Sequence, residues 1–285
     1  MEYLLGIDIG TSGTKTVLFD RDANPITAKT FEYPLYQEQN GWAEQEPEDW
    51  WNAVVQGVQA VLQASGVDAA DIKGIGLSGQ MHGLVTLDEN DNVIRPAILW
   101  NDGRTFKEVD YLNNTIGKER LSVLTANIAF AGFTAPKLLW MRENEPENFK
   151  KIYKWLDIKE YLILRASGEF VMTQDSAFGT LLYDTRKGHE GWCNPVCKMV
   201  GVNIEHMPTI KKSTEEVGKI TEKAAKELGL AEGTAVYGGG GDASLIGVGA
   251  GAVEIGDTHI YSGTSGWVGT VVPEQIVDAG AMMAA

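Results

Sequence analysis

The sequence contains little cysteine, little positive charge and no long hydrophobic run, and each shortage excludes a class of protein. Only 2 cysteines occur in 285 residues, too few for a disulfide-stabilised scaffold of this size. Lys and Arg total 24 against 39 Asp and Glu, and no basic stripe occurs, so we expect no nucleic-acid partner. The net charge of -15 favours solubility and says little about function.

No apolar segment approaches the roughly 20 residues that a membrane-spanning helix needs, so we expect no membrane contact. The first apolar run lacks a basic start and is interrupted by Asp8, which argues against a secretion signal and predicts a cytoplasmic protein. With 44% hydrophobic and 22% charged residues, the chain has a globular composition. Its length fits one large domain or two, and a homodimer stays open.

The two cysteines, Cys193 and Cys197, lie close to His189, which raises the question of a metal site. Their spacing matches no common zinc pattern. Two buried thiols are therefore the favoured interpretation.

Short apolar runs separated by turn residues predict three antiparallel strands at the start of the chain, over residues 3–10, 14–20 and 26–33. A helix then begins at Pro47, which suits the first helical position, and ends at Gly66. The next strand, 73–78, is reached through that helix and is expected to run parallel to its neighbour. This order predicts an α/β domain of ribonuclease-H-like type, with a mixed sheet flanked by helices.

The remaining elements follow from pattern alone. The middle of the chain, 106–164, is helix-rich, and 181–185 is a short strand or a loop. A charged amphipathic helix is predicted over 215–228. The last predicted elements are a strand at 235–238, a helix at 243–250 and a β-hairpin at 259–272.

The run from Asp8 to Lys15 has the composition of a phosphate-binding turn. Gly10 allows close approach of backbone N–H groups, Thr11 and Ser12 add hydroxyl donors, and Lys15 adds positive charge. Asp8 would then hold Mg²⁺ through water. The alternative is an ordinary hairpin turn after a strand, and the run is not a Walker A loop.

The glycine run that ends in Asp242 places a carboxylate where a strand gives way to a helix. Asp in that place is most often an N-cap. It also suits a general base that accepts the proton of a substrate hydroxyl, and the two roles are compatible.

Two further segments carry polar groups next to glycine or an aromatic ring. The run 78–83 includes His82, which taken alone is most often structural. The run from Trp100 to Arg104 sets an aromatic ring beside hydrogen-bonding groups, which suits a polyhydroxylated ligand but equally a surface turn.

Taken together, these segments resemble the FGGY family of carbohydrate kinases, and the resemblance runs along the whole chain in the expected order. Among the matching runs are GIDIGTSG, GWAEQEPEDWW, IGLSGQMHG and PAILWNDGR. The matching runs cover residues 6–13, 41–51, 75–83, 96–104, 132–140, 239–242 and 263–266.

The resemblance implies two ribonuclease-H-like domains of the actin/hexokinase type, with sugar bound mainly by the first and ATP mainly by the second. Residues 1–254 would form the sugar-binding domain, and 255–285 the truncated beginning of an ATP-binding domain that is otherwise missing. The implied reaction is ATP-dependent, magnesium-dependent phosphorylation of a sugar hydroxyl, with D-xylulose converted to D-xylulose 5-phosphate. The chain alone is expected not to be competent.

By the same resemblance, Asp242 is the catalytic base and Asp8 positions the metal. The implied sugar contacts are Gln80, Met81, His82, Trp100 and Asp102. The implied ATP-phosphate contacts are Gly10, Thr11, Ser12, Lys15, Gly263, Thr264, Ser265 and Gly266.

One residue departs from the xylulose-phosphorylating pattern, which usually has Asn where Ala243 stands. Since that position typically contributes to sugar contacts, another ketose, a polyol or a sugar acid stays open as substrate. A non-catalytic sugar sensor is disfavoured because both carboxylates, Asp8 and Asp242, are present. A chaperone-like ATPase is disfavoured by the sugar-type runs between 75 and 104.

Overall fold

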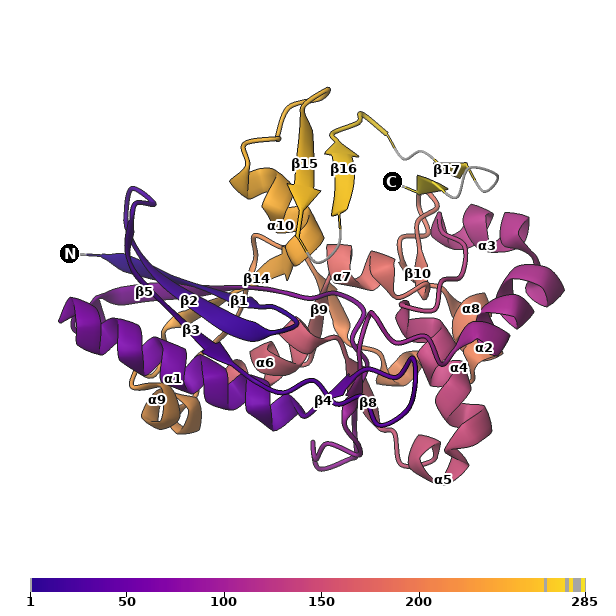
Figure 1. Cartoon of the computed structure of the whole chain (residues 1–285), viewed down its shortest axis with the longest axis horizontal. Helices are drawn as coiled ribbons and strands as arrows, with labels where there is room; N and C mark the ends of the chain where they lie inside the picture. Colours follow the sequence, from indigo (N-terminus) through magenta and orange to yellow (C-terminus); the bar gives the residue numbers. More distant parts are fainter. Residues whose placement is uncertain (1, 264–265, 275–276, 279–282, 285) are drawn as a thin grey trace.

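A six-stranded mixed sheet, in the order β13-β14-β5-β1-β2-β3, lies on the left-hand side of the molecule in Figure 1. The computed structural model describes residues 2–263, 266–274, 277–278 and 283–284. The strands of this sheet are β1 (Tyr3–Ile9), β2 (Gly13–Asp20), β3 (Pro25–Glu32), β5 (Ile72–Gly79), β13 (Glu216–Lys219) and β14 (Ala235–Gly241).

Strand β1 pairs antiparallel with β2 on one side and parallel with β5 on the other. Strand β14 continues the parallel set beside β5, while β3 and β13 close the two edges in antiparallel pairs. The predicted meander, crossover helix and parallel strand are therefore confirmed. As a result, β1, β5 and β14 all end at the same edge of the sheet.

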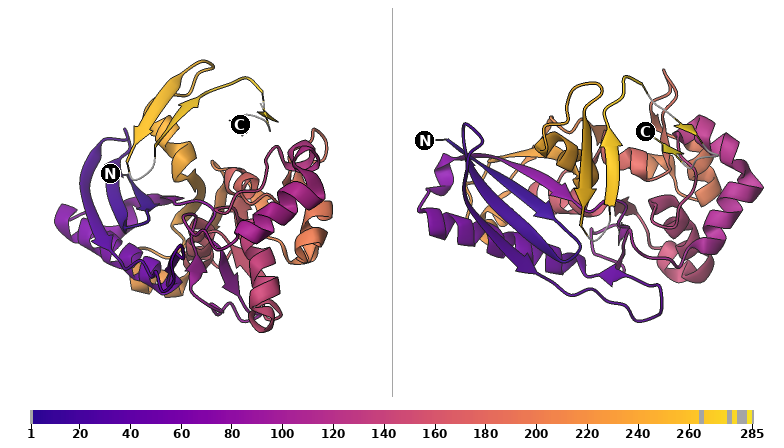
Figure 2. Two further views of the ribbon diagram at one scale, coloured as in Figure 1. Left: turned by 45° about the vertical axis from the view of Figure 1, so that its right-hand side comes forward. Right: turned by 45° about the horizontal axis from the view of Figure 1, so that its top comes forward.

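Three helices cover one face of the sheet (Figures 1 and 2). They are α1 (Pro47–Ser65), α6 (Ile158–Ser167) and α9 (Glu222–Leu228). Alternate residues of β1, Leu5 and Ile7, point into the core between the sheet and these helices, where Trp50 and Val58 of α1 meet them. The opposite face of β1 carries exposed residues, including Asp8.

Helix α1 begins and ends where local chemistry predicts. Pro47 occupies the first turn, and Gly66 follows the last residue with φ 67°, the left-handed conformation that glycine adopts without strain. The Gly66 N–H donates to the carbonyl of Leu62 and so satisfies one of the last helical acceptors.

The middle of the chain builds a helical lobe beside the sheet, with its own hydrophobic cluster. Its helices are α2 (Phe106–Asp110), a π-helical segment (Tyr111–Gly117), α3 (Lys118–Thr125), α4 (Thr134–Asn144), α5 (Pro146–Phe149), α7 (Gln174–Gly179) and α8 (Asn194–Val200). Two 3₁₀ turns occupy Ala69–Asp71 and Ile204–His206.

Several short strand pairs lie outside the six-stranded sheet. They are β4 (Glu44–Gln45) with β7 (Ala97–Ile98), β6 (Val85–Leu87) with β8 (Lys154–Leu156), β9 (Val171–Thr173) with β12 (Thr209–Lys211), and β10 (Tyr183–Asp184) with β11 (Gly191–Trp192). The segment predicted as a strand or a loop at 181–185 thus contains a two-residue strand.

Both cysteines are buried in the helical lobe, as predicted, and neither forms a disulfide. Burial raises the pKa of the Cys197 thiol to about 12. Within the described ranges, no group of three or more His, Cys, Asp or Glu residues is arranged to hold a metal ion. The same part of the chain contains no helix that is both long and apolar enough to cross a bilayer.

Helix α10 (Asp242–Gly249) follows β14 directly, and a hairpin of β15 (Thr258–Ser262) and β16 (Gly266–Thr270) comes next, as predicted. The hairpin stands on the side of the sheet away from α1 and α9 (Figure 1). A last short pair joins β17 (Val277–Asp278) to β18 (Met283–Ala284). Thr264 and Ser265 lie outside the described residues.

The predicted helix at 215–228 is wrong in its first half. Residues Glu216–Lys219 form the edge strand β13, which pairs with β14 and buries Val217 in the core. Helix α9 begins only after Thr221, whose side chain accepts a hydrogen bond from the Ala224 N–H at 3.2 Å. The charged pattern fits a helix surface and a sheet edge alike, and pairing with a distant strand decides between them.

Strand β14 needs glycine at Gly239 because its backbone lies close to that of β5, and the cost of a side chain there can be measured. Gly239 has φ 62°, and a Cβ there would overlap the Leu77 carbonyl oxygen of β5. We expect Gly239→Ala to lower the free energy of unfolding by about 3 kcal/mol or more. Gly66→Ala is the matched control because its φ is 67° and nothing lies within 4 Å, so about 1 kcal/mol is expected. Equal losses in urea denaturation would contradict the close-contact explanation.

Candidate active site

A pocket of about 380 Å³ opens at the edge where β1, β5 and β14 end. We call it the carboxylate pocket. In open α/β sheets, ligands bind outside the carboxyl ends of the strands, because loops from several strands converge there. The residues that line it and that the sequence had singled out are Asp8, Gly10, Thr11, Ser12, Gln80, Met81, His82, Trp100 and Asp242.

Asp242 is the first residue of α10, and its Oδ1 accepts a hydrogen bond from the Ala243 N–H at 2.8 Å. Burial raises the pKa of Asp242 above its ordinary value, the Ala243 hydrogen bond opposes this, and the negative charge of Asp8 raises it further. The two carboxylates therefore share one pocket and influence each other. A raised pKa suits a carboxylate that accepts a proton during a reaction.

Asp8 lies on the face of β1 that the helices leave uncovered, with its side chain open to the pocket. The surrounding walls desolvate it and raise its pKa, while a hydrogen bond from Ser78 and the charge of Lys15 act in the opposite direction. Lys15 is the cross-strand partner of Asp8 in β2. Lys15 is exposed and does not line the pocket, so its contribution is electrostatic.

Two buried glutamine side chains hold the turn after β1. Gln45 donates to the Thr11 carbonyl at 2.7 Å, and Gln80 donates to the Gly10 carbonyl at 3.3 Å and to Gln45 Oε1 at 3.0 Å. Trp50 donates to the same Gln45 oxygen at 3.0 Å. The Gln80 amide, predicted to contact sugar, is thus engaged with backbone and Gln45. Sequence reasoning missed Gln45, because a glutamine two residues before a helix start carries no local signal.

Aromatic side chains form the walls of the carboxylate pocket. Trp100 donates its indole N–H to Thr11 Oγ1 at 3.0 Å, which joins the wall to the turn after β1. Tyr261 and Trp267, cross-strand partners in the β15–β16 hairpin, stack with ring centroids 4.1 Å apart and also line the pocket. Sequence reasoning missed Tyr261 and Trp267. As cross-strand partners in the predicted hairpin, the two side chains point to the same face of it.

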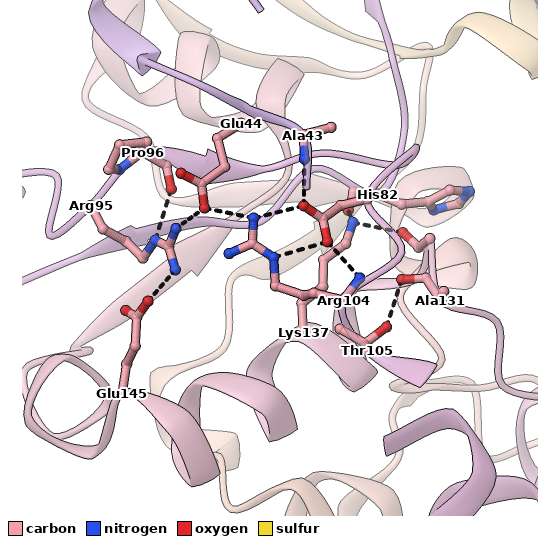
Figure 3. Close-up of polar contacts among 12 residues, drawn as sticks. Ala43, Glu44, His82, Arg95, Pro96, Arg104, Thr105, Ala131, Lys137 and Glu145 are labelled. Carbon is pink, nitrogen blue, oxygen red and sulfur yellow. Dashed lines mark hydrogen bonds and ion pairs between the residues drawn. The ribbon is translucent and has the colours of Figure 1, made fainter. Parts of the chain in front are cut away.

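Asp102 does not reach the pocket. Asp102 is 1% exposed, and its carboxylate accepts hydrogen bonds from the Ala43 N–H at 2.6 Å and from the Arg104 side chain at 2.9 and 2.7 Å. Arg104 also pairs with Glu44 at 2.7 Å (Figure 3). Its guanidinium carbon lies 3.6 Å from the ring centroid of Trp42. Asp102 therefore belongs to a buried ion network behind the pocket wall.

The second predicted phosphate turn is only partly described. Gly263 and Gly266 flank the hairpin turn and are not among the residues that line the carboxylate pocket. Thr264 and Ser265, between them, are outside the described residues. The predicted role of this turn stays a prediction.

A larger hollow of about 1020 Å³ adjoins the carboxylate pocket and shares Met81, His82 and Ala243 with it. Asp175 of α7 lines this adjoining hollow, and its Oδ2 accepts a hydrogen bond from the Gly241 N–H at 2.7 Å. Asp175, which sequence reasoning missed, thereby fixes the backbone just before Asp242.

The pocket offers hard oxygen donors suited to magnesium bound together with a phosphate ligand. Mg²⁺ in phosphoryl-transfer sites is held by one or two carboxylates, with water and phosphate oxygens completing its shell. Asp8 supplies such a carboxylate beside the hydroxyls of Thr11 and Ser12. A magnesium–nucleotide therefore fits these residues better than a metal held by protein ligands alone.

The sheet order and the helices on its face define a ribonuclease-H-like fold of the actin/hexokinase type, as predicted. Residues 3–249 match the family model "FGGY family of carbohydrate kinases, N-terminal domain", so the chain belongs to this family.

Similar proteins of known structure or name include three kinases. The xylulose kinase of Bacillus subtilis (strain 168) is 40% identical over 267 residues, which cover 93% of this chain and 53% of that protein. A xyloylose kinase from Brucella ovis is 36% identical with a TM-score of 0.87, and the match covers 94% of this chain and 54% of that protein's chain. A gluconate kinase from Lactobacillus acidophilus is 28% identical with a TM-score of 0.91, at 97% and 55% coverage. The chain thus spans about half the length of the relatives it matches.

The coupling between the two carboxylates can be measured directly. In a ¹³C NMR titration, the Asp242 carboxyl is expected to titrate above its ordinary value of 3.8. Asp8→Asn is expected to lower that midpoint, because removal of a neighbouring negative charge favours the ionised form. Asp20, whose pKa is lowered by hydrogen bonds from Asn24, is the internal reference and should not move. An Asp242 midpoint indifferent to Asp8→Asn would place the two groups in separate environments.

Proposed function

We propose that this chain carries the sugar site and the catalytic base of an ATP-dependent sugar kinase, with D-xylulose as the substrate. The observation that carries the proposal is the joint position of Asp8 and Asp242 in one pocket, beside the glycine-hydroxyl turn after β1. A carboxylate base and a metal-positioning carboxylate are the protein groups that phosphoryl transfer to an alcohol needs. Membership of the FGGY family supports the same reaction.

In the proposed mechanism, Asp242 accepts the proton of a sugar hydroxyl while that oxygen attacks the γ-phosphorus of ATP. The bond between the γ-phosphorus and the bridging oxygen breaks, ADP leaves, and the proton stays on Asp242. Bound Mg²⁺ would neutralise charge on the phosphates, with Asp8 holding it through water. The raised pKa of Asp242 favours proton acceptance, and it requires activity to fall as the pH drops through that pKa.

The sugar would lie between Asp242 and the Met81–His82 segment, with Trp100 as one wall of the pocket. D-xylulose is preferred because the B. subtilis relative, a xylulose kinase, is 40% identical over most of this chain. A sugar acid is the second candidate, because the L. acidophilus gluconate kinase has a TM-score of 0.91. Gly10, Thr11 and Ser12 would contact the ATP phosphates.

We also propose that 1–254 is the sugar-binding domain and that the β15–β16 hairpin begins an ATP-binding domain. Two features support this division. The family match ends at residue 249, close to the end of α10. The outer face of the hairpin exposes Ile260 and Val268, at 77% and 67%, which is typical of strands that pack against further structure. On this view the 285-residue chain binds sugar but turns over no ATP by itself.

The test of function is a substrate panel of ketoses, polyols and sugar acids, with ADP release measured on the complete gene product. D-xylulose is expected to give the highest kcat/KM. Asp242→Asn is expected to lower kcat by about 10²–10⁴-fold while the sugar dissociation constant changes little, because only proton transfer is removed. The isolated 285-residue chain is expected to bind the sugar in calorimetry without releasing ADP.

Three outcomes would count against the proposal. Activity retained in Asp242→Asn would remove the assigned base. Biological function without any sugar-dependent ADP release would favour a sugar-binding regulator. ATP turnover by the isolated chain would contradict the proposed division of domains.

Ala243 is expected to contribute to the choice of sugar, because it lines both the carboxylate pocket and the adjoining hollow. Ala243→Asn adds a hydrogen-bonding amide where the sugar would lie. We expect this variant to change the ratio of kcat/KM values between D-xylulose and the next best substrate by about tenfold or more, the range of one or two new hydrogen bonds. Ala250→Asn, at the other end of α10, is the control. The same panel assay decides, and an unchanged ratio would remove Ala243 from the sugar site.

A further inference from the structure

His82 has an unusual backbone conformation for a residue with a side chain. Its φ is 65°, in the left-handed region. That region costs an ordinary residue about 1–2 kcal/mol relative to the right-handed one. His82 lines both the carboxylate pocket and the adjoining hollow, so the strain sits at the proposed sugar site. Such strain persists only where the surrounding structure enforces it.

The side chain of Asp157 holds the N–H of this residue. Asp157 Oδ2 accepts a hydrogen bond from the His82 N–H at 3.0 Å, and its Oδ1 accepts one from Thr134 Oγ1 at 3.2 Å. Asp157 stands at the N-cap position of α6, yet it makes no side-chain cap to that helix. An aspartate in that place ordinarily caps its own helix. Here the carboxylate is directed to the His82 backbone instead.

The side chain of Lys137 holds the carbonyl of the same residue. Lys137 Nζ donates to the His82 carbonyl oxygen at 2.6 Å and to the Gly132 carbonyl oxygen at 2.7 Å (Figure 3). Lys137 is fully buried in the first turns of α4. The N–H and the carbonyl of His82 are thus each hydrogen-bonded to a buried ionisable side chain, one acidic and one basic.

The ring of His82 is also confined. It meets Phe133 edge-on, with ring centroids 4.9 Å apart. On another side lies Gly179, where an added Cβ would overlap the imidazole. Burial and the Lys137 ammonium lower the pKa of His82 to about 3, so the ring is neutral at pH 7. Phe133 and Gly179 thus restrict the position of the ring, while the hydrogen bonds to Asp157 and Lys137 hold the peptide.

Stability alone does not account for the burial of these two ionisable side chains. Burial lowers the pKa of Lys137 and raises that of Asp157, which reflects the cost of removing both groups from water. Replacement of buried charges by apolar residues is often neutral or stabilising. The convergence of both groups on one strained residue indicates a positional role.

We propose that Lys137 and Asp157 are positioning residues that hold His82 in its left-handed conformation, so that Met81 and His82 present a fixed surface to the sugar. This inference rests on the proposed function for the identity of the ligand. The two side chains act through His82 and do not themselves line either hollow. Their loss should weaken sugar binding by releasing the His82 segment.

The test is a double-mutant cycle on the complete gene product, with the D-xylulose dissociation constant measured by calorimetry. Lys137→Met, which keeps an unbranched apolar stem but removes the ammonium group, is expected to weaken binding about tenfold, the equivalent of the strain in His82. In the His82→Ala background the same change is expected to alter binding less than about twofold, because the positioned group is already absent. Additive losses would overturn the proposal.

Asp157 gives a second, independent arm if Lys137→Met fails to fold. Asp157→Ala is expected to weaken binding about tenfold in the same way. Asp157→Asn keeps an oxygen that accepts from the His82 N–H and is expected to restore binding to within about threefold of the unmodified protein. Equal binding by the Ala and Asn variants would overturn the proposal.

Lys159→Met is the matched control for the loss of a buried lysine. Lys159 is 2% exposed and donates to the Gly238 carbonyl at 3.0 Å, not to His82. Its loss is expected to lower the thermal midpoint and to show no coupling with His82→Ala. Coupling as large as that of Lys137 would mean that the effect is not specific to this pair.

A crystal structure of Lys137→Met decides the question without any ligand. We expect φ of residue 82 to leave the left-handed region in that variant. A retained φ near 65° in both Lys137→Met and Asp157→Ala would overturn the inference. If the unmodified protein binds no sugar of the panel, the proposed function fails, and this structural result still decides whether the two side chains position His82.

Discussion

The site depends on one constraint, the parallel alignment of β1, β5 and β14, which brings three strand ends to one edge of the sheet. Asp8 comes from the first of these ends, the Met81–His82 segment follows the second, and Asp242 follows the third. Because the backbone ladder sets the spacing between neighbouring strands, it also sets the spacing of the groups they carry. The position of Asp8 and Asp242 in one pocket therefore follows from the pairing of the strands that carry them.

Buried polar side chains then fix the backbone at each of these strand ends. Gln45 holds the turn after β1, Lys137 holds the segment after β5, and Asp175 holds the peptide before Asp242. Each of them bonds a main-chain group, so the rigidity of the pocket comes from side chains outside it. This arrangement is typical of sites in which geometry must be kept while the reacting groups remain exposed.

Local pattern was enough to predict much of the fold and part of the site. The strands β1, β2 and β3, helix α1 and its end at Gly66 follow from periodicity and turn chemistry within a few residues. The turn after Asp8 and the Asp242 helix start were recognisable for the same reason. Gln45 and Asp175 were not, because the backbone groups that they bond, in Thr11 and Gly241, lie far away in the chain. The strand β13 was predicted as a helix because its pairing with the distant strand β14 cannot be read from a local pattern of charged residues.

By itself, the sequence determined which chemical groups stand at the ends of the strands, since those residues and their flanking glycines are local properties. Only the tertiary structure decided which of these groups remain available. Asp8 and Asp242 open into one pocket, whereas the carboxylate of Asp102 is occupied by Arg104 and the Ala43 N–H. The physical reason is that a carboxylate's availability depends on the donors that packing brings to it, and those donors come from other parts of the chain.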